Sequence, residues 1–276
     1  MSNDPVHLER HDVPFAGATL AVWTCGPADA PALVVCHGGA LDHSAFRELA
    51  LRHATKLRVV LWDMPGHGQS PRLASSFTAA ACAEAMTLVM DHLGAAGAVV
   101  LGFSFGGVVA QLAAKARPDL VERLIAYGCL SPHLGKPLVP RALVPALVAG
   151  RFGSMSWPAI RERFGELCCV TPEGQAAVRR DMAPVGKAGF MAMARANFTA
   201  SDRATPFRIR GGVDLIAGAL DSNGETIWST FRAFEAAYPA IRKILVADAG
   251  HCAHLDQPEA FARAVDELIR TPRSPS

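Results

Sequence analysis

The run Gly102-Phe103-Ser104-Phe105-Gly106 carries the strongest chemical signal in this sequence. It follows the apolar segment 98–102, and the residues from 105 onward are typical of a helix. A sharp turn from strand to helix strains its central residue and holds the hydroxyl out into a site, while the flanking glycines allow close packing. A match to G-x-S-x-G arises by chance in roughly one such sequence in ten, so Ser104 as nucleophile needs partners elsewhere in the chain.

A second signal, His37-Gly38-Gly39-Ala40, follows the apolar segment 32–36. When a serine attacks a carbonyl, negative charge develops on the carbonyl oxygen, and two fixed N–H groups must stabilise it. The amide of Phe105, directly after the nucleophile, is one natural donor, and the amide of Gly39 is the predicted second. The side chain of His37 is interpreted as structural, orienting this loop.

A serine nucleophile also needs a base with a near-neutral pKa, and His251 is predicted to be that base. It follows the last apolar segment, at the strand end where ligands gather in open parallel sheets. Its rival His254, three residues later, is expected to face another direction. Asp221, just beyond the segment 213–218, is predicted to be the acid that holds the tautomer of the base and stabilises its charged form.

Other carboxylates are less suitable as the acid. Asp214 stands at the opposite end of its strand, and Asp248 lies too close to His251 along the chain to turn back and meet its ring. The segment 127–131, which follows the strand after the nucleophile, contains no carboxylate at all. Asp221 is therefore the candidate that remains.

These residues must be positioned by a sheet with helices packed against it. Short apolar runs predict strands, and Ala-rich segments between them predict helices, one of them beginning after Thr78 as its N-cap. Continuous apolar runs indicate a sheet covered on both faces, and the alternation indicates parallel strands with right-handed crossovers. The predicted strands are 18–23, 32–36, 58–62, 98–102, 124–127, 213–218 and 243–247, and the predicted helices lie near 44–55, 79–93, 105–117, 225–237 and 258–270.

One region interrupts this alternation. Between about 131 and 205 there are seven prolines and several helix-like pieces, but no convincing buried strand. A structureless loop of that length is improbable in a compact domain, so a helical insertion is predicted. The expected organisation is a core formed by 1–130 and 206–276, with a helical cap formed by 131–205.

Composition limits the partners. The chain of 276 residues is 50% hydrophobic and has a net charge of +2 with no Lys/Arg run, so neither nucleic acid nor an anionic membrane is expected to bind. No apolar run approaches the roughly 20 residues that span a bilayer, and the N-terminus lacks the apolar core of a secretory signal. Seven cysteines without a C-x-x-C pair suggest neither disulfides nor zinc, which favours a cytoplasmic location.

With these residues identified, the chain resembles the α/β-hydrolase superfamily along nearly its whole length. The segment 63–70 (DMPGHGQS) resembles the family's D-x-P-G-x-G-x-S turn, and 251–258 (HCAHLDQP) resembles its catalytic-histidine segment. The order Ser104, Asp221, His251 is the one expected for this fold. The resemblance implies an α/β fold with a mostly parallel eight-stranded sheet, and structural roles for Asp63 and His67.

The expected function is hydrolysis of a carboxylic ester or lactone of a small apolar or aromatic substrate, through an acyl-enzyme on Ser104 and without a cofactor or metal. Alternatives on the same residues are a carbon–carbon bond hydrolase of ring-cleavage products, an acyltransferase or perhydrolase, and a non-catalytic receptor. The segment 138–152 contains few charged residues, which favours an apolar substrate. The predicted substrate contacts are Phe103, Met155, Trp157 and Phe190; the sequence carries no prediction of the oligomeric state.

Overall fold

The computed structural model describes residues 7–73, 77–134, 140–200, 207–238 and 240–270. Its centre is an eight-stranded sheet in the order β1-β2-β4-β3-β5-β6-β7-β8, in which β3 to β8 are parallel and β2 pairs antiparallel with both β1 and β4. The predicted α/β fold class is thus confirmed. The strands are β1 (Glu9–Phe15), β2 (Ala18–Cys25), β3 (Ala32–Cys36), β4 (Arg58–Trp62), β5 (Ala98–Phe103), β6 (Val121–Tyr127), β7 (Val213–Gly218) and β8 (Lys243–Val246).

The strand β1 has no counterpart among the segments read as strands from their apolar residues. Its first half is polar and solvent-exposed, and only Val13 and Phe15 are buried. An edge strand with one solvent-exposed face lacks the continuous apolar run that identifies the other strands. Its pairing partner β2, by contrast, is buried over most of its length.

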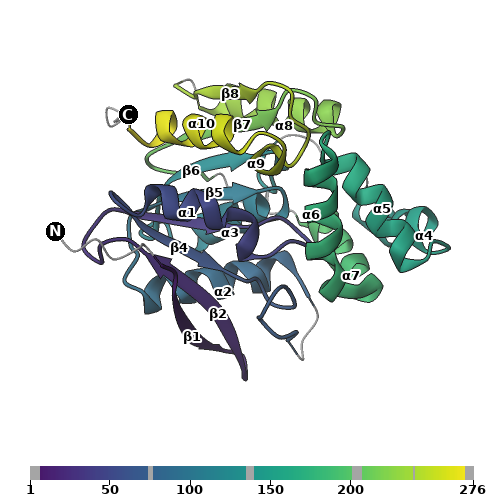
Figure 1. The fold of residues 1–276 in the computed structure, drawn as a ribbon, viewed down its shortest axis with the longest axis horizontal. Helices are drawn as coiled ribbons and strands as arrows, with labels where there is room; N and C mark the ends of the chain where they lie inside the picture. Colours follow the sequence, from purple (N-terminus) through teal and green to yellow (C-terminus); the bar gives the residue numbers. More distant parts are fainter. Residues whose placement is uncertain (1–6, 74–76, 135–139, 201–206, 239, 271–276) are drawn as a thin grey trace.

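Two layers of helices cover the sheet, as Figure 1 shows. The helices α1 (Arg47–His53) and α10 (Pro258–Arg270) lie on one face, where Arg52 pairs with Glu259 at 2.7 Å and His53 with Asp266 at 2.9 Å. The helices α2 (Ala79–His92), α3 (Phe105–Ala116) and α8 (Gly224–Ala237) lie on the other. A single 3₁₀ turn, η1 (His43–Phe46), precedes α1, and the short α9 (Ala253–Asp256) precedes α10. Thr78 caps α2 as predicted, accepting from the amide of Ala81 at 3.1 Å.

The region with many prolines forms four helices and no strand within its described residues 140–200. They are α4 (Val144–Phe152), α5 (Trp157–Cys168), α6 (Pro172–Met182) and α7 (Gly186–Thr199), with 3₁₀ turns η2 (Arg141–Leu143) and η3 (Ala183–Val185). Prolines stand in the first turn of α4, α5 and α6, where a missing N–H costs no hydrogen bond, so they begin these helices rather than break them.

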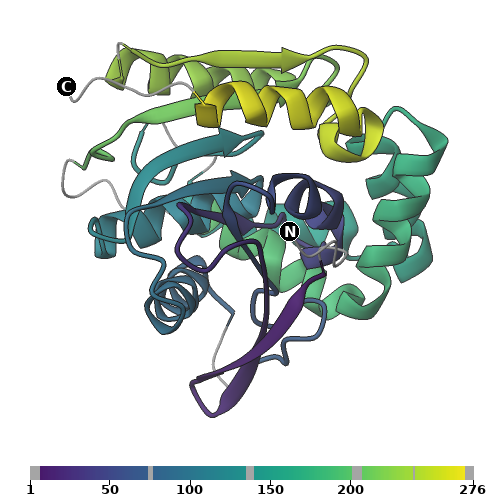
Figure 2. The same ribbon diagram turned by 60° about the vertical axis from the view of Figure 1, so that its left-hand side comes forward.

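These four helices lie together at one end of the sheet, toward which the arrowheads of the parallel strands point (Figures 1 and 2). That end is where the loops carrying Ser104, Asp221 and His251 emerge. The division into a core of 1–130 and 206–276 and a cap of 131–205 stays a prediction, and its boundary at 205 lies outside the described residues.

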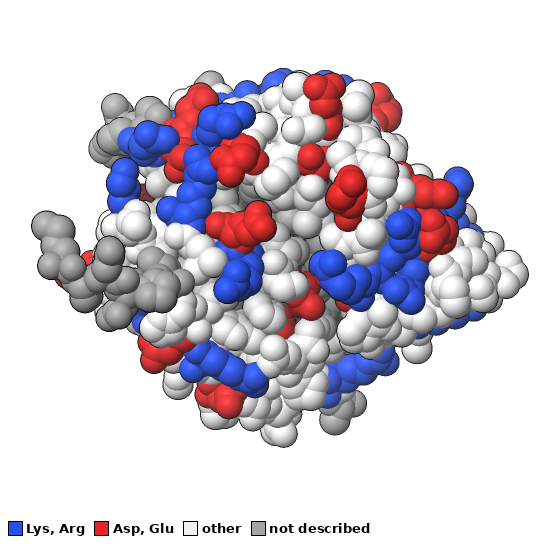
Figure 3. Space-filling model, viewed as in Figure 1, with Lys and Arg blue, Asp and Glu red and all other residues white. Residues whose placement is uncertain are grey.

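The core consists of the two buried faces of the sheet and the helix faces that pack on them. Val34, Val60 and Val100 on the central strands have no exposed surface, as expected for strands covered on both sides. All seven cysteines are free and buried. Across the part of the chain that the structure describes, no helix combines the length and apolarity that crossing a membrane requires. Basic and acidic side chains are interspersed on the face drawn in Figure 3.

Candidate active site

Ser104 lies on the turn between β5 and α3, and its backbone is strained. Its φ of 51° and ψ of −119° fall where residues with a side chain are rarely found. The flanking glycines are needed for close approach: a Cβ on Gly106 would collide with the carbonyl oxygens of Cys36 and His37, and one on Gly102 would lie 2.6 Å from Cα of Gly107. The predicted geometry of the G-x-S-x-G run is therefore present, and the turn packs directly on the end of β3.

The side chains of Ser104, His251 and Asp221 form one hydrogen-bonded chain. Nε2 of His251 lies 3.0 Å from Oγ of Ser104, and Nδ1 of the same ring lies 2.7 Å from Oδ2 of Asp221. The three residues come from the loops that follow β5, β7 and β8. Parallel strands end at the same edge of a sheet, which is why residues up to 147 positions apart in sequence meet here.

The environment of Asp221 favours its ionised form. Burial raises the pKa of Asp221, but the His251 ring and the hydrogen bonds from His251 and Asn223 lower it by more, so the net pKa lies below the ordinary value. The backbone N–H of Asn223 donates to Oδ1 at 2.8 Å, which leaves Oδ2 for the ring. An ionised Asp221 accepts the Nδ1 proton of His251, so Nε2 is free to accept a proton from Ser104.

The rival His254 points away from Ser104. Its Nδ1 lies 3.0 Å from the hydroxyl of Tyr127, and its ring stacks on Phe46 with the centroids 4.4 Å apart. Burial, followed by the charge of His251, lowers the pKa of His254 to about 3, so it is neutral at neutral pH. His254 is the second residue of α9 and is buried, so its ring faces another direction from that of His251, as the sequence predicted.

The alternative carboxylates are not hydrogen-bonded to the ring of His251 in the described structure. Asp214 is fully buried and forms an ion pair with Arg242 at 2.6 Å, at the far end of β7 from the site. Asp248 is solvent-exposed and lies on a turn with a φ of 52°. Among the described residues, Asp221 is the carboxylate that is hydrogen-bonded to the ring of His251.

The loop after β3 places Gly39 beside the nucleophile. Gly39, Ser104 and Phe105 line the same cavity. Phe105 is the first residue of α3, so its N–H has no acceptor within the helix and is available to another oxygen. His37 holds the loop: its Nδ1 donates to the carbonyl of Gly38 at 2.8 Å, and its Nε2 accepts from the amide of Met64 at 3.0 Å. The structural interpretation of His37 agrees with these bonds, while the oxyanion role of the Gly39 and Phe105 amides stays a prediction.

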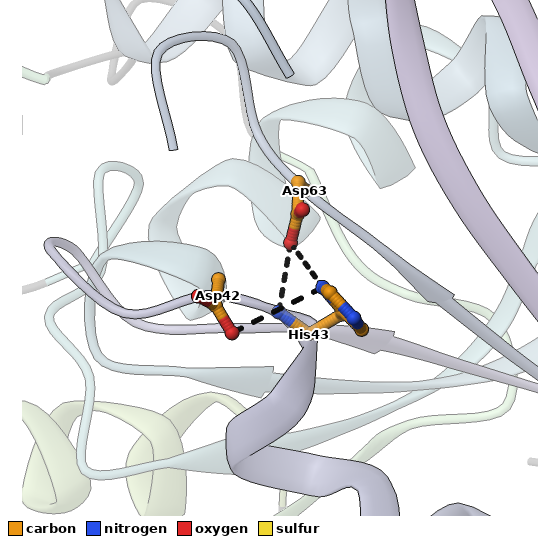
Figure 4. Close-up of side chains that lie close together, drawn as sticks. All are labelled: Asp42, His43 and Asp63. Atoms are coloured by element: carbon orange, nitrogen blue, oxygen red, sulfur yellow. Dashed lines mark hydrogen bonds and ion pairs between the residues drawn. The ribbon is translucent and has the colours of Figure 1, made fainter. Parts of the chain in front are cut away.

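Asp63 is the centre of a clamp that joins this loop to the turn after β4 (Figure 4). One of its oxygens accepts from the backbone N–H and from Nδ1 of His43, at 2.8 and 2.9 Å, and the other accepts from the N–H of Gln69 at 2.8 Å. Asp42, which caps η1 through the N–H of Ser44, completes the group. The atoms of Asp42, His43 and Asp63 that could bind a metal ion lie within 4.8 Å of one another. The hydrogen bonds described above account for this arrangement without a metal.

His67, in the same turn, has a structural environment as well. It is buried, and its Nδ1 donates to the carbonyl of Pro65 at 3.1 Å. Burial, and then the neighbouring charge of His37, lower the pKa of His67 to about 3. It is therefore neutral at neutral pH and cross-links the turn, in agreement with the structural roles that the resemblance implied for Asp63 and His67.

A cavity of about 210 Å³ opens above Ser104. Its wall combines the loops around the hydrogen-bonded chain with side chains from α4, α5, α7 and α8. Apolar groups dominate this wall. The lining residues are Gly39, Ser104, Phe105, Gly128, Leu130, Arg151, Phe152, Phe164, Leu167, Cys168, Phe190, Met193, Ala194, Asn197, Phe198, Asn223, Thr226, Ile227 and His251.

Of the four predicted substrate contacts, the cavity wall contains Phe190 but not Phe103, Met155 or Trp157. Phe103 is 1% exposed because its side chain lies behind the site, between the rings of Tyr127 and His251 at 4.4 and 4.9 Å. Trp157 packs against Phe190, with the centroids 5.9 Å apart, and its Nε1 points to the carbonyl of Ala183. Phe103 and Trp157 therefore support the wall from behind, and Met155 is not part of it, which corrects the expectation from the sequence.

Sequence reasoning missed most of the residues that line the cavity. Three of the missed residues, at positions 193, 194 and 197, share a single face of α7 with the predicted Phe190. That spacing is visible in the sequence. It does not reveal whether the face covers the site or packs within the four-helix region, so it could not have separated pocket from core.

Asp181 on α6 is expected to make the free energy of unfolding depend on pH. Its side chain is buried, Oδ2 has no hydrogen-bond partner, and burial raises its pKa to about 6 despite the nearby Arg180. Because the folded pKa exceeds the unfolded value of about 3.9, stability is lost as pH rises from about 4 through 6. Asp181→Asn should therefore stabilise the fold by roughly 2–3 kcal/mol above pH 7 and by little near pH 4, measured by urea unfolding.

The matched control is Glu166→Gln on α5, which removes an exposed carboxylate and should leave the pH profile of unfolding unchanged. A gain from Asp181→Asn that is the same at pH 4 and pH 8 would contradict the assignment to ionisation of Asp181.

Comparisons with known proteins agree with this architecture. The model of the Alpha/beta hydrolase family matches residues 33–264. The chain is 31% identical over 204 residues to the magnesium-chelatase 30 kDa subunit of Rhodobacter capsulatus, covering 70% of this chain and 63% of that protein. It is 25% identical over 245 residues to a pimeloyl-[acyl-carrier protein] methyl ester esterase of Neisseria meningitidis, covering 84% of this chain and 91% of that protein.

A solved structure shows the same fold. The enol-lactonase from Burkholderia xenovorans aligns with a TM-score of 0.76 over 95% of this chain and all of that one, at 21% sequence identity. The family match spans most of the chain and includes β3, the turn at Ser104 and the segment after β8. The chain therefore belongs to the alpha/beta hydrolase family.

Proposed function

We propose that this chain is a serine hydrolase that cleaves a carboxylic ester or lactone of a small apolar or aromatic substrate. The observation that carries the proposal is the hydrogen-bonded chain, with 3.0 Å between Ser104 and His251 and 2.7 Å between His251 and Asp221. These distances lie within the reach that nucleophile and base require before substrate binds. The strained backbone of Ser104 supports the same role, since such strain collects at functional sites.

In the proposed mechanism, Nε2 of His251 takes the proton of Ser104 as its oxygen attacks the substrate carbonyl. The negative charge on the carbonyl oxygen is held by the amides of Gly39 and Phe105, and Asp221 stabilises the imidazolium. The intermediate collapses, the alkoxide leaves with the proton from His251, and an acyl-enzyme remains. Water then attacks the acyl group, giving its proton to His251, and Ser104 departs as the free hydroxyl when that proton returns.

The substrate class is inferred from the cavity. A volume of about 210 Å³ is small beside the roughly 300–1,000 Å³ of typical ligand pockets, so a short acyl or single-ring group fits it. Phe152, Phe164, Phe190 and Ile227 supply apolar walls. The names of two similar proteins, a methyl ester esterase and an enol-lactonase, are consistent with ester or lactone bonds.

The organisation of the chain supports a further part of the proposal. The helices α4, α5 and α7 contribute residues to the cavity wall, which supports residues 131–205 as a cap that selects the substrate. The seven free, buried cysteines support a reducing compartment such as the cytoplasm.

The test is a substrate panel combined with active-site labelling. A fluorophosphonate should attach to one peptide, the one that contains Ser104, and should block turnover of 4-nitrophenyl butanoate and of small lactones. Activity on a vinylogous dienoate alone would identify a carbon–carbon bond hydrolase, and product formed only with a non-water acceptor would identify an acyltransferase. Binding of substrates without labelling or turnover would contradict the proposal.

A further inference from the structure

One face of α7 forms the ceiling of the cavity above Ser104. Phe190, Met193, Ala194 and Asn197 all line the cavity, at the i, i+3, i+4 and i+7 positions of a single helix face. Three of these side chains are apolar. Asn197 is the polar member, and it stands in the last turn of the helix.

The side-chain oxygen Oδ1 of Asn197 is buried and has no hydrogen-bond partner within the described part of the chain. Nearly all buried polar atoms in proteins are hydrogen-bonded, and an unpaired one opposes folding. Because Asn197 also lines the cavity, a group on a bound substrate can supply the hydrogen bond that its amide lacks.

Met193, one helical turn before Asn197, shows where Asn197 lies relative to the reacting atoms. Met193 packs over Gly39 so closely that a Cβ on this glycine would collide with the Met193 thioether. Asn197 lies four residues further on the same face, about 6 Å along the helix axis. Rotation about the Cβ–Cγ bond can turn either the oxygen or the NH₂ group of its amide toward the cavity, because this torsion is broad.

We infer that Asn197 is a specificity-determining residue, which pairs with a hydroxyl or amide group that the substrate carries about one helical turn from its scissile carbonyl. An amide both donates and accepts, so it matches a neutral group with the same capacity. It supplies no charge, and it would not compensate a buried carboxylate. This inference rests on the proposed ester or lactone hydrolysis. It restricts the preferred substrates to those whose apolar group also carries one hydroxyl or amide.

The test compares substrates of matched size that differ in one group. On the acyl side, 4-nitrophenyl 6-hydroxyhexanoate is compared with the heptanoate, and the 3-hydroxybutanoate with the 3-methylbutanoate. On the alcohol side, 6-hydroxyhexyl acetate is compared with heptyl acetate. After correction for the rates with hydroxide, we expect kcat/KM to favour the hydroxylated member of at least one pair by about 10-fold, although the apolar cavity alone would favour the alkyl member.

The variant Asn197→Leu should bring that ratio of kcat/KM to about 1 or below. It should also raise Tm by roughly 2–4 °C in the absence of substrate, because it removes an unpaired buried oxygen. The matched control is Thr199→Val on the same helix, whose hydroxyl bonds the carbonyl of Arg195 and does not line the cavity. This variant should leave the ratio within 2-fold of wild type.

The outcomes separate the two proposals. Wild type that hydrolyses neither these esters nor the small lactones would overturn the proposed function. Wild type that hydrolyses them all, but prefers the alkyl member of every pair, would overturn the role of Asn197 alone. A fall in Tm for Asn197→Leu, with the ratio unchanged, would make Asn197 a structural residue and would equally reject the inference.

Discussion

Replacing Ser104 with alanine is expected to lower kcat for 4-nitrophenyl butanoate by roughly 10⁴- to 10⁶-fold. The hydroxyl that Ser104 places 3.0 Å from Nε2 of His251 is the proposed attacking group, and no acyl-enzyme can form without it. The activity that remains would come from the cavity and the amides of Gly39 and Phe105, which would still stabilise the charge of a carbonyl attacked by water. The measurement is steady-state kinetics, together with loss of fluorophosphonate labelling.

Two controls accompany this variant. Its circular dichroism spectrum should match wild type, because the substitution removes one oxygen from the cavity wall and leaves the turn between β5 and α3 intact. Ser229→Ala, which changes an exposed serine on α8, should retain full activity. A Ser104→Ala protein that folds and keeps more than a tenth of wild-type kcat would refute Ser104 as the nucleophile.

Asp221→Asn should lower kcat by about 10⁴-fold. The N–H of Asn223 donates to Oδ1 at this position, so an asparagine would keep its oxygen there and turn its NH₂ group toward His251. A donor facing Nδ1 forces the proton of the ring onto Nε2, and Nε2 can then no longer accept the proton of Ser104. The loss should appear in kcat with little change in KM, because Asp221 is not on the cavity wall.

The same variant has a second readout in its stability. The pKa of Asp221 is lowered in the folded protein, so its ionisation stabilises the fold above the unfolded value of about 3.9 and ceases to do so as pH falls through the folded pKa. Wild type should therefore exceed Asp221→Asn in Tm at pH 5 to 8, and the difference should shrink below pH 4.

The control for Asp221→Asn is Asp248→Asn, which changes an exposed carboxylate three residues before His251. Asp248 is exposed on a turn with positive φ, which asparagine tolerates well, so activity should stay within 2-fold of wild type. If Asp248→Asn abolished activity and Asp221→Asn did not, the assignment of the acid would be wrong.

Much of the fold could be predicted from local patterns because those patterns have local causes. A strand buried on both faces must be apolar throughout, so β3, β5 and β7 were identified with bounds that differ from the structure by no more than one residue. Thr78 could be named as an N-cap because the cap bond spans only three residues. The strand β1 could not be predicted in this way, because one of its faces is exposed to solvent. Its pairing with β2 therefore leaves no continuous apolar run in the sequence.

The order and spacing of Ser104, Asp221 and His251 determined by themselves which side chains to consider, since each follows a predicted strand and parallel strands end together. The sequence also predicted that His254 faces away from Ser104, but only the tertiary structure decided what each ring contacts. It places His251 against Ser104 and His254 against Tyr127, and it brings Asp63 from another loop to hold the turn beside Gly39.

Most of the cavity wall contributed by the four-helix region could not be predicted from the sequence. Phe190 and Trp157 are both large apolar residues of the same four-helix region, yet one lines the cavity and the other supports it from behind. Apolar side chains carry the same local signal whether they face a ligand or a neighbouring helix, because burial is favourable in both places. The packing of α7 over the sheet distinguishes them, and that packing is set by contacts distant in sequence.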